Sequence, residues 1–176
     1  MKKLLLNVMV SFPMLLLGIG PVLAGSELTS FTSAASVGPI LQMTVSQNTD
    51  SELKFGNIIP SALGPTQAAP QIITIDVQSN SGTKYVVTQV ANGALDNGRG
   101  DTIGLENLRF RTASGTTAGA AVPDLTPMTA GAAQTIFTSN DQGESGTIQA
   151  EYQLSVPSSQ APGDYSTFIT FTVSST

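Results

Sequence analysis

The stretch Ile148-Gln149-Ala150-Glu151-Tyr152-Gln153-Leu154-Ser155-Val156 decides the fold class, because apolar or aromatic residues alternate in it with polar ones without a break. Successive side chains of a β-strand point to opposite faces, so this pattern predicts an antiparallel strand with one face in a core and one in water. A second stretch, Tyr165-Ser166-Thr167-Phe168-Ile169-Thr170-Phe171-Thr172-Val173, has the same period, with Phe168 expected to face the opposite way. The link 157–164, rich in Ser, Pro and Gly, separates the two. Together they indicate an all-β chain.

Six further β-rich runs precede these two strands, and links rich in Asn, Gly, Pro and Ser separate them. The runs cover 41–45, 53–58, 71–77, 84–90, 105–112 and 135–138. About seven to eight short strands at such intervals are typical of an antiparallel β-sandwich. We therefore expect two sheets that share one core, and the most apolar strand faces should contribute to it Tyr152, Leu154, Ile169, Phe171 and Val173.

Two links between the expected strands are long. The link 91–104 contains the turn dipeptides Asn92-Gly93 and Asn97-Gly98, which favour tight turns. The link 113–134 is dominated by Ala, Gly, Thr and Pro, and we expect a mobile loop there with at most a short irregular strand.

The amino-terminal residues have the pattern of a signal peptide. A short cationic start, Met1-Lys2-Lys3, precedes an apolar run over 4–20, and small residues at Val22 and Ala24 precede a polar junction. We expect cleavage after Ala24, a flexible segment over 25–38 and a sandwich domain over 39–176. An uncleaved membrane anchor is the alternative, which Pro13 within the apolar run and Pro21 directly after it disfavour.

Charge and length limit the partners of the exported chain. Removal of Lys2 and Lys3 with the leader leaves about 150 residues, with five basic residues against twelve acidic ones and a formal charge of −7. Nucleic acids and anionic lipids require basic patches, so neither is an expected partner. No second apolar stretch has spanning length, so we expect no membrane span after processing.

Catalysis lacks the side chains that it would need. The chain contains no Cys and no His, so neither a thiol nucleophile nor a serine nucleophile with a histidine base can be assembled. Lys54 and Lys84 are the only lysines outside the leader, and both lie in expected strands, where a solvent-facing lysine is common. We expect no enzymatic activity and no cofactor.

Two loops carry the acidic residues that could bind calcium. Asp96 and Asp101 lie in one Gly-containing loop, and Asp141 and Glu144 lie in another. Ca²⁺ prefers oxygen ligands from such loops, but neither loop has the spacing of an EF-hand. Asp, Asn and Gly are also the residues that tight turns require. We therefore treat the four as weak calcium candidates and expect no metal site.

Two patches of the sequence resemble a known family. They are Leu53-Lys54-Phe55-Gly56 after an alternating run, and the stretch from Ile148 to Val173, in which Ser159-Gln160-Ala161-Pro162-Gly163-Asp164-Tyr165 leads into the last alternating strand. Both resemble the subunits of archaic chaperone–usher pili and the related spore-coat-protein-U-like domains.

The resemblance implies an incomplete immunoglobulin-like sandwich that lacks one strand. In that family a periplasmic chaperone fills the gap first, an usher exports the subunit, and the amino-terminal extension of the next subunit then replaces the chaperone. It implies that the chain passes through the periplasm to the cell surface and pairs with like subunits. The assembly strand would carry Tyr165, Ile169, Phe171 and Val173.

The sequence leaves two points open. The segment 26–38 has only Leu28, Phe31 and Val37 as large apolar residues, whereas the alternating run 41–45 could be either a donor strand or the first strand of the domain itself. A complete sandwich, acting as a secreted adhesion, surface or matrix module without strand exchange, is the competing function. A binding module for a polysaccharide or hydrophobic ligand is a third, although no aromatic cluster points to it.

Overall fold

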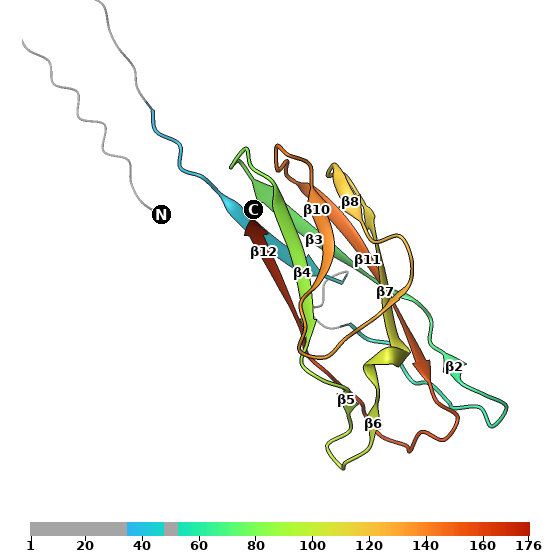
Figure 1. Ribbon diagram of the computed structural model, residues 1–176. Coiled ribbons are helices and arrows are strands. Elements are labelled where there is room, and N and C mark those ends of the chain that lie inside the picture. The colour runs from blue at the N-terminus through green and yellow to red at the C-terminus, as the bar shows by residue number, and fades with distance from the viewer. Residues whose placement is uncertain (1–34, 48–52) are drawn as a thin grey trace, which may run out of the picture. The chain divides into compact units, whose positions relative to one another are not determined.

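Antiparallel strands of six or more residues carry the fold in this computed structural model, which describes residues 35–47 and 53–176 (Figure 1). There are seven of them in the described part of the chain, and all lie in one unit, Val37–Thr176. The expected signal peptide 1–24, its cleavage site and most of the segment 25–38 lie outside the described residues. No helix in the described ranges is long and apolar enough to cross a membrane.

The strands form two main sheets and one small ribbon. In the first sheet, the order is β1 (Leu41–Ser46), β3 (Gln71–Ser79), β11 (Gly146–Val156), β7 (Leu108–Ser114) and β9 (Thr126–Pro127), with β2 (Thr66–Gln67) pairing the end of β11. In the second sheet, the order is β12 (Ile169–Ser175), β4 (Tyr85–Ala91), β10 (Gln134–Ser139) and β8 (Gly119–Ala121). The ribbon pairs β5 (Leu95–Asp96) with β6 (Thr102–Ile103).

The core lies between the two main sheets and follows the alternation in the sequence. Strand β11 buries five alternate residues, and β4 buries four from the opposite side. They are Ile148, Ala150, Tyr152, Leu154 and Val156 on β11, and Tyr85, Val87, Gln89 and Ala91 on β4. The all-β antiparallel sandwich predicted from the sequence is thereby confirmed.

Three predicted strands differ from the observed ones at identifiable residues. The run 53–58 forms no strand, because Gly56 has a φ of 75° and interrupts the extended chain, although Leu53 packs against the core. The run 105–112 begins with a 3₁₀ turn, η1 (Leu105–Asn107), and becomes a strand only at Leu108.

The third difference concerns the start of the last strand. β12 begins at Ile169, whereas we expected it to begin at Tyr165. Ser166 instead exchanges two backbone hydrogen bonds with Asp96 of β5, of 2.9 and 3.1 Å. Phe168 points outward as predicted and is 78% exposed.

The segment 113–134, expected to be a mobile loop, contains two short strands, β8 and β9, that pair with the two different sheets. Thr112, just before it, is buried and connects the sheets on this side. Its backbone N–H donates to the carbonyl oxygen of Val122 (2.6 Å), and its hydroxyl donates to the carbonyl oxygen of Ile136 on β10 (2.6 Å). The same hydroxyl accepts the N–H of Val122 at 2.8 Å. This side of the sandwich is therefore closed.

Candidate functional site

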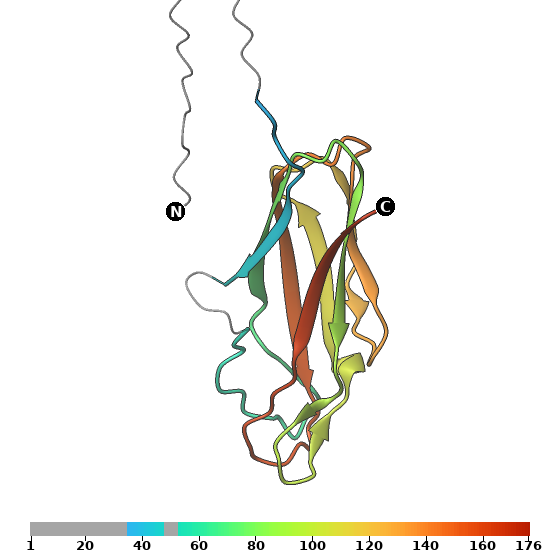
Figure 2. The ribbon, with the colours of Figure 1, turned by 90° about the vertical axis from the view of Figure 1, so that its left-hand side faces the viewer.

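The side of the sandwich away from Thr112 ends in two edge strands, β1 and β12. Within the described residues, β1 pairs with β3 alone and β12 with β4 alone. The two edges belong to different sheets, approach each other, and lie on the same side of the sandwich (Figure 2). Each therefore presents a row of main-chain groups that no described strand pairs.

Each edge strand contributes three half-buried apolar side chains that pack against the core. We call this set the β1–β12 seam: Leu41, Met43, Val45, Ile169, Phe171 and Val173.

Burial falls abruptly between the inner strands and the seam. Val45 lies opposite Ile75, and Val173 lies opposite Val87. Ile75 and Val87 have 0% exposure, whereas their seam partners are only half-buried. Neighbouring strands are only about 4.8 Å apart, so one strand spacing separates a fully enclosed side chain from a partly solvated one. The seam is thus an apolar layer of the core that lacks cover on its outer side.

The structure brings together three of the four residues that sequence analysis assigned to an assembly strand. Ile169, Phe171 and Val173 share the seam, but Tyr165 precedes β12. The Tyr165 hydroxyl donates to the carbonyl oxygen of Ala161 (2.8 Å) and accepts a bond from Gln160 Nε2 (2.7 Å). Tyr165 therefore holds the link that leads to β12.

The β1 half of the seam was not among the site residues predicted from the sequence. The run 41–45 was expected to be either a donor or the first strand of the domain, and the structure places it in the domain as β1. The alternation of Leu41, Met43 and Val45 was the available signal, but a period of two gives the buried face of a strand and not its neighbour.

Asp96 and Asp101, the first pair of calcium candidates, stabilise the turn between β5 and β6. Asp96 Oδ1 accepts the N–H of Gly98 at 2.5 Å, and Asp101 Oδ2 accepts a bond from Asn97 Nδ2 at 2.9 Å. Gly98 has a φ of 70°, which this turn requires. These contacts explain the residues of this loop without a metal ion.

The second pair, Asp141 and Glu144, lies between β10 and β11. Asp141 forms an ion pair with Lys84 Nζ at 2.8 Å, and the Lys84 ammonium group lowers the pKa of the Asp141 carboxyl below its usual range. Glu144 Oε2 accepts a bond from Asn140 Nδ2 at 2.9 Å. Across residues 35–47 and 53–176, no group of three or more His, Cys, Asp or Glu is arranged as a metal site.

The chain matches no family model, no curated protein and no solved structure. Fold and site together describe an antiparallel β-sandwich that is closed on one side and has an uncovered apolar seam on the other.

Proposed function

We propose that this chain is an exported structural subunit that assembles with copies of itself by accepting a β-strand at the β1–β12 seam. The observation that carries the proposal is the drop from full to half burial between the inner strands and the seam. An immunoglobulin-like sandwich that lacks one strand has such a layer, and the pilin family that the sequence resembles uses it for assembly at the cell surface.

Filling the seam is energetically favourable for two reasons. Complete burial of a large apolar side chain contributes roughly 1.5 to 3 kcal/mol, and the six seam residues have gained only part of that. A strand added to the free edge of β1 or of β12 would also pair main-chain groups that are otherwise open to pairing with other chains.

The proposed donor is the segment 25–38 of another copy. Val37 in this segment is 82% exposed, so its side chain is free to enter the seam of another copy. Leu28 and Phe31 are the other large apolar residues of the segment. Residues 41–46 form β1 and so belong to the acceptor. From the resemblance we further propose a periplasmic chaperone and an outer-membrane usher as transient partners during export.

The test moves the donor segment within one chain. The carboxyl terminus lies at the end of the sandwich where β1 begins. The Thr176 N–H donates to the carbonyl oxygen of Lys84, and the Asn80 N–H donates to the carbonyl oxygen of Ile40, just before β1. Asn80 and Lys84 both lie in the short link between β3 and β4. A variant in which 25–38 follows Thr176 through a short Gly/Ser linker can therefore return along the seam. Light scattering after gel filtration should show oligomers for the exported chain and monomers for the variant, and the variant should melt at a higher temperature.

A matched control carries Asp in place of Leu28 and Phe31 in the moved segment, and it should neither become monomeric nor gain stability. The result that contradicts the proposal is an exported chain that is monomeric at every concentration, with a cooperative melt that the moved segment leaves unchanged. That result would favour a self-contained secreted sandwich, acting as an adhesion, surface or matrix module.

A further inference from the structure

Two arginines on the outward face of β7 have different surroundings. Arg111 lies opposite Glu151 on β11 and forms an ion pair with it, with Nη2 and Nε at 2.7 and 3.1 Å from Glu151 Oε2. Arg109 lies opposite Gln153 on the same strand and opposite Pro127 on β9. Its guanidinium has no hydrogen bond or ion pair within the described part of the chain. The sheet thus pairs one arginine with a carboxylate and leaves the other without an ion pair among the described residues.

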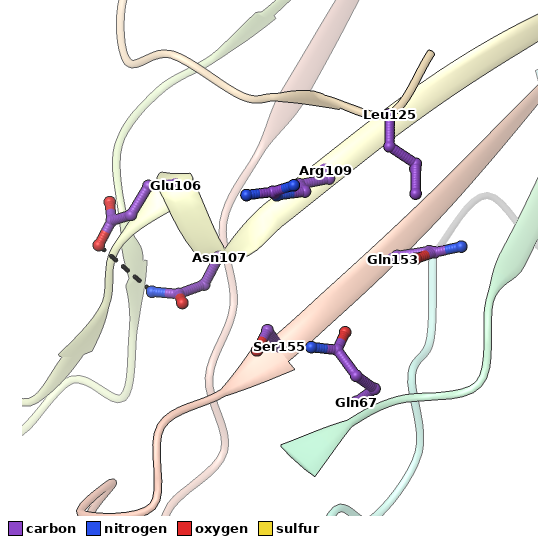
Figure 3. Close-up of a pocket in the computed structure, with 7 residues that line it drawn as sticks. All are labelled: Gln67, Glu106, Asn107, Arg109, Leu125, Gln153 and Ser155. Carbon is purple, nitrogen blue, oxygen red and sulfur yellow. Dashed lines mark hydrogen bonds between the residues drawn. The ribbon is translucent and has the colours of Figure 1, made fainter. Parts of the chain in front are cut away.

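Arg109 lies in a hollow of about 350 Å³ (Figure 3). Glu106 and Asn107 lie at one end of it, and Leu125 and Gln153 lie at the other. The full lining consists of Gln67, Glu106, Asn107, Arg109, Leu125, Gln153 and Ser155. The volume falls at the lower end of the range for small-ligand sites, which is about 300 to 1,000 Å³.

The amide side chains of the hollow use their nitrogens internally. Gln67 Nε2 donates to Ser155 Oγ at 2.9 Å, Gln153 Nε2 donates to Glu151 Oε1 at 2.8 Å, and Asn107 Nδ2 donates to Glu106 Oε1 at 3.2 Å. Their three amide oxygens accept no hydrogen bond from the described residues. The hollow therefore combines one forked cationic donor, Arg109, with several acceptors, namely the three amide oxygens and the Glu106 carboxylate.

A complementary ligand carries a single anionic group for Arg109 and several hydroxyl donors, for the amide oxygens and for the Glu106 carboxylate. A planar carboxylate suits the fork of a guanidinium, which donates two parallel hydrogen bonds. We propose that this hollow binds a uronic acid residue of an acidic polysaccharide. The sugar carboxylate pairs with Arg109, its hydroxyls donate to Gln67, Gln153 and Asn107, and the apolar Leu125 borders the ring.

Two features favour a sugar over an acidic peptide. The acceptors surround a single cation, which suits a compact ring that is dense in hydroxyl groups. Peptides are commonly recognised along a free strand edge by main-chain hydrogen bonds, whereas this hollow is lined by side chains on the outer face of a sheet, away from the edges β1 and β12.

The test is an NMR or calorimetric titration of the exported chain with trigalacturonate, with the neutral galactotriose as the probe without carboxylates. We expect binding of trigalacturonate and at least about tenfold weaker binding of galactotriose. Arg109→Gln should weaken binding by at least about tenfold, whereas the matched change Arg99→Gln, which removes the same charge from the turn between β5 and β6 outside the hollow, should leave affinity within about twofold.

Gln153→Glu is a second test variant, which keeps the Arg109 cation and adds a carboxylate that competes for it. It places a carboxylate opposite Arg109, as Glu151 already lies opposite Arg111, and should block the sugar while retaining the fold in circular dichroism. Equal loss in the Arg109 and Arg99 variants would overturn the site, as would equal affinity for galactotriose or no binding of trigalacturonate. Equal or tighter Arg109-dependent binding of triaspartate would overturn the assignment to a sugar.

Discussion

Tyr152 on β11 donates its phenolic proton to Oε1 of Gln89 on β4 at 2.5 Å, and this bond joins the two sheets inside the core. Both side chains have 0% exposure. The other end of the Gln89 amide donates to Met128 Sδ at 3.1 Å, so the amide has partners for both of its polar atoms. The pair thus fixes how the two sheets align, because an offset would leave buried polar atoms without partners.

Tyr152→Phe should lower the free energy of unfolding by about 1 to 3 kcal/mol, because Gln89 Oε1 would remain buried without a donor. Adding Gln89→Leu should recover part of that loss, since removal of both partners costs less than removal of one. Urea unfolding of the four members of this double-mutant cycle provides the measurement. A loss below about 0.5 kcal/mol in the single variant would mean that the bond contributes little.

Alkaline pH should destabilise the protein through the same residue. Burial raises the pKa of Tyr152 well above its ordinary value of 10.0. The unfolded chain therefore loses this proton first, so the stabilisation is complete below about pH 10 and falls above it by up to about 1.4 kcal/mol per pH unit. Unfolding curves between about pH 9 and 12 should show a shallower decline for Tyr152→Phe than for the unaltered chain. Identical slopes would contradict the shift.

Phe171→Ala and Phe110→Ala compare an edge side chain with an enclosed one. Phe110 is 1% exposed, so Phe110→Ala should lower the free energy of unfolding by about 3 to 5 kcal/mol. Phe171 is half-buried, so Phe171→Ala should lower it clearly less in the isolated chain. Moving the segment 25–38 behind Thr176 should raise the cost of Phe171→Ala toward that of Phe110→Ala. Equal costs without the moved segment would show that Phe171 is already enclosed.

Gly143→Ala and Gly98→Ala separate steric from conformational strain. Both glycines have positive φ, 56° and 70°, so alanine should cost about 1 to 2 kcal/mol at either position from backbone conformation alone. A Cβ on Gly143 would also meet the carbonyl oxygen of Thr83, while Gly98 faces open space. The melting temperature should therefore fall further for Gly143→Ala, and an equal fall at both positions would contradict the close approach.

The long strands were predicted well from the sequence, because a strand with one polar and one apolar face leaves no ambiguity about which side chains point into the core. The stretch ending at Val156 became β11 with its alternate residues buried. Strand β4 was recognised, but its inner face could not be assigned from sequence, since it turns the polar Gln89 inward and Val86 and Val90 outward. That orientation is favourable because Tyr152, 63 residues away, and Met128, 39 residues away, supply partners for the buried amide.

The candidate site was predicted in part for a related reason. The half formed by Ile169, Phe171 and Val173 follows from local alternation, but the approach of two edge strands from different sheets is a long-range property. The strand expected over 53–58 failed at Gly56, where a positive φ ends the extended run. The hollow around Arg109 had no sequence signal, because it depends on which residue of β11 lies opposite each arginine.

The hydrogen bonds of Thr112 hold the two sheets together on the side with β7, β8 and β10. No hydrogen bond between strands joins the sheets on the opposite side, at β1 and β12, among the described residues. Local opening starts where the fewest contacts hold the chain, so the two sheets should separate first at β1 and β12. Amide hydrogen exchange would then be fast at those two strands and slowest at Thr112 and Val122. A strand that enters the seam therefore needs to separate only the edge strands β1 and β12, while the side held by Thr112 stays closed.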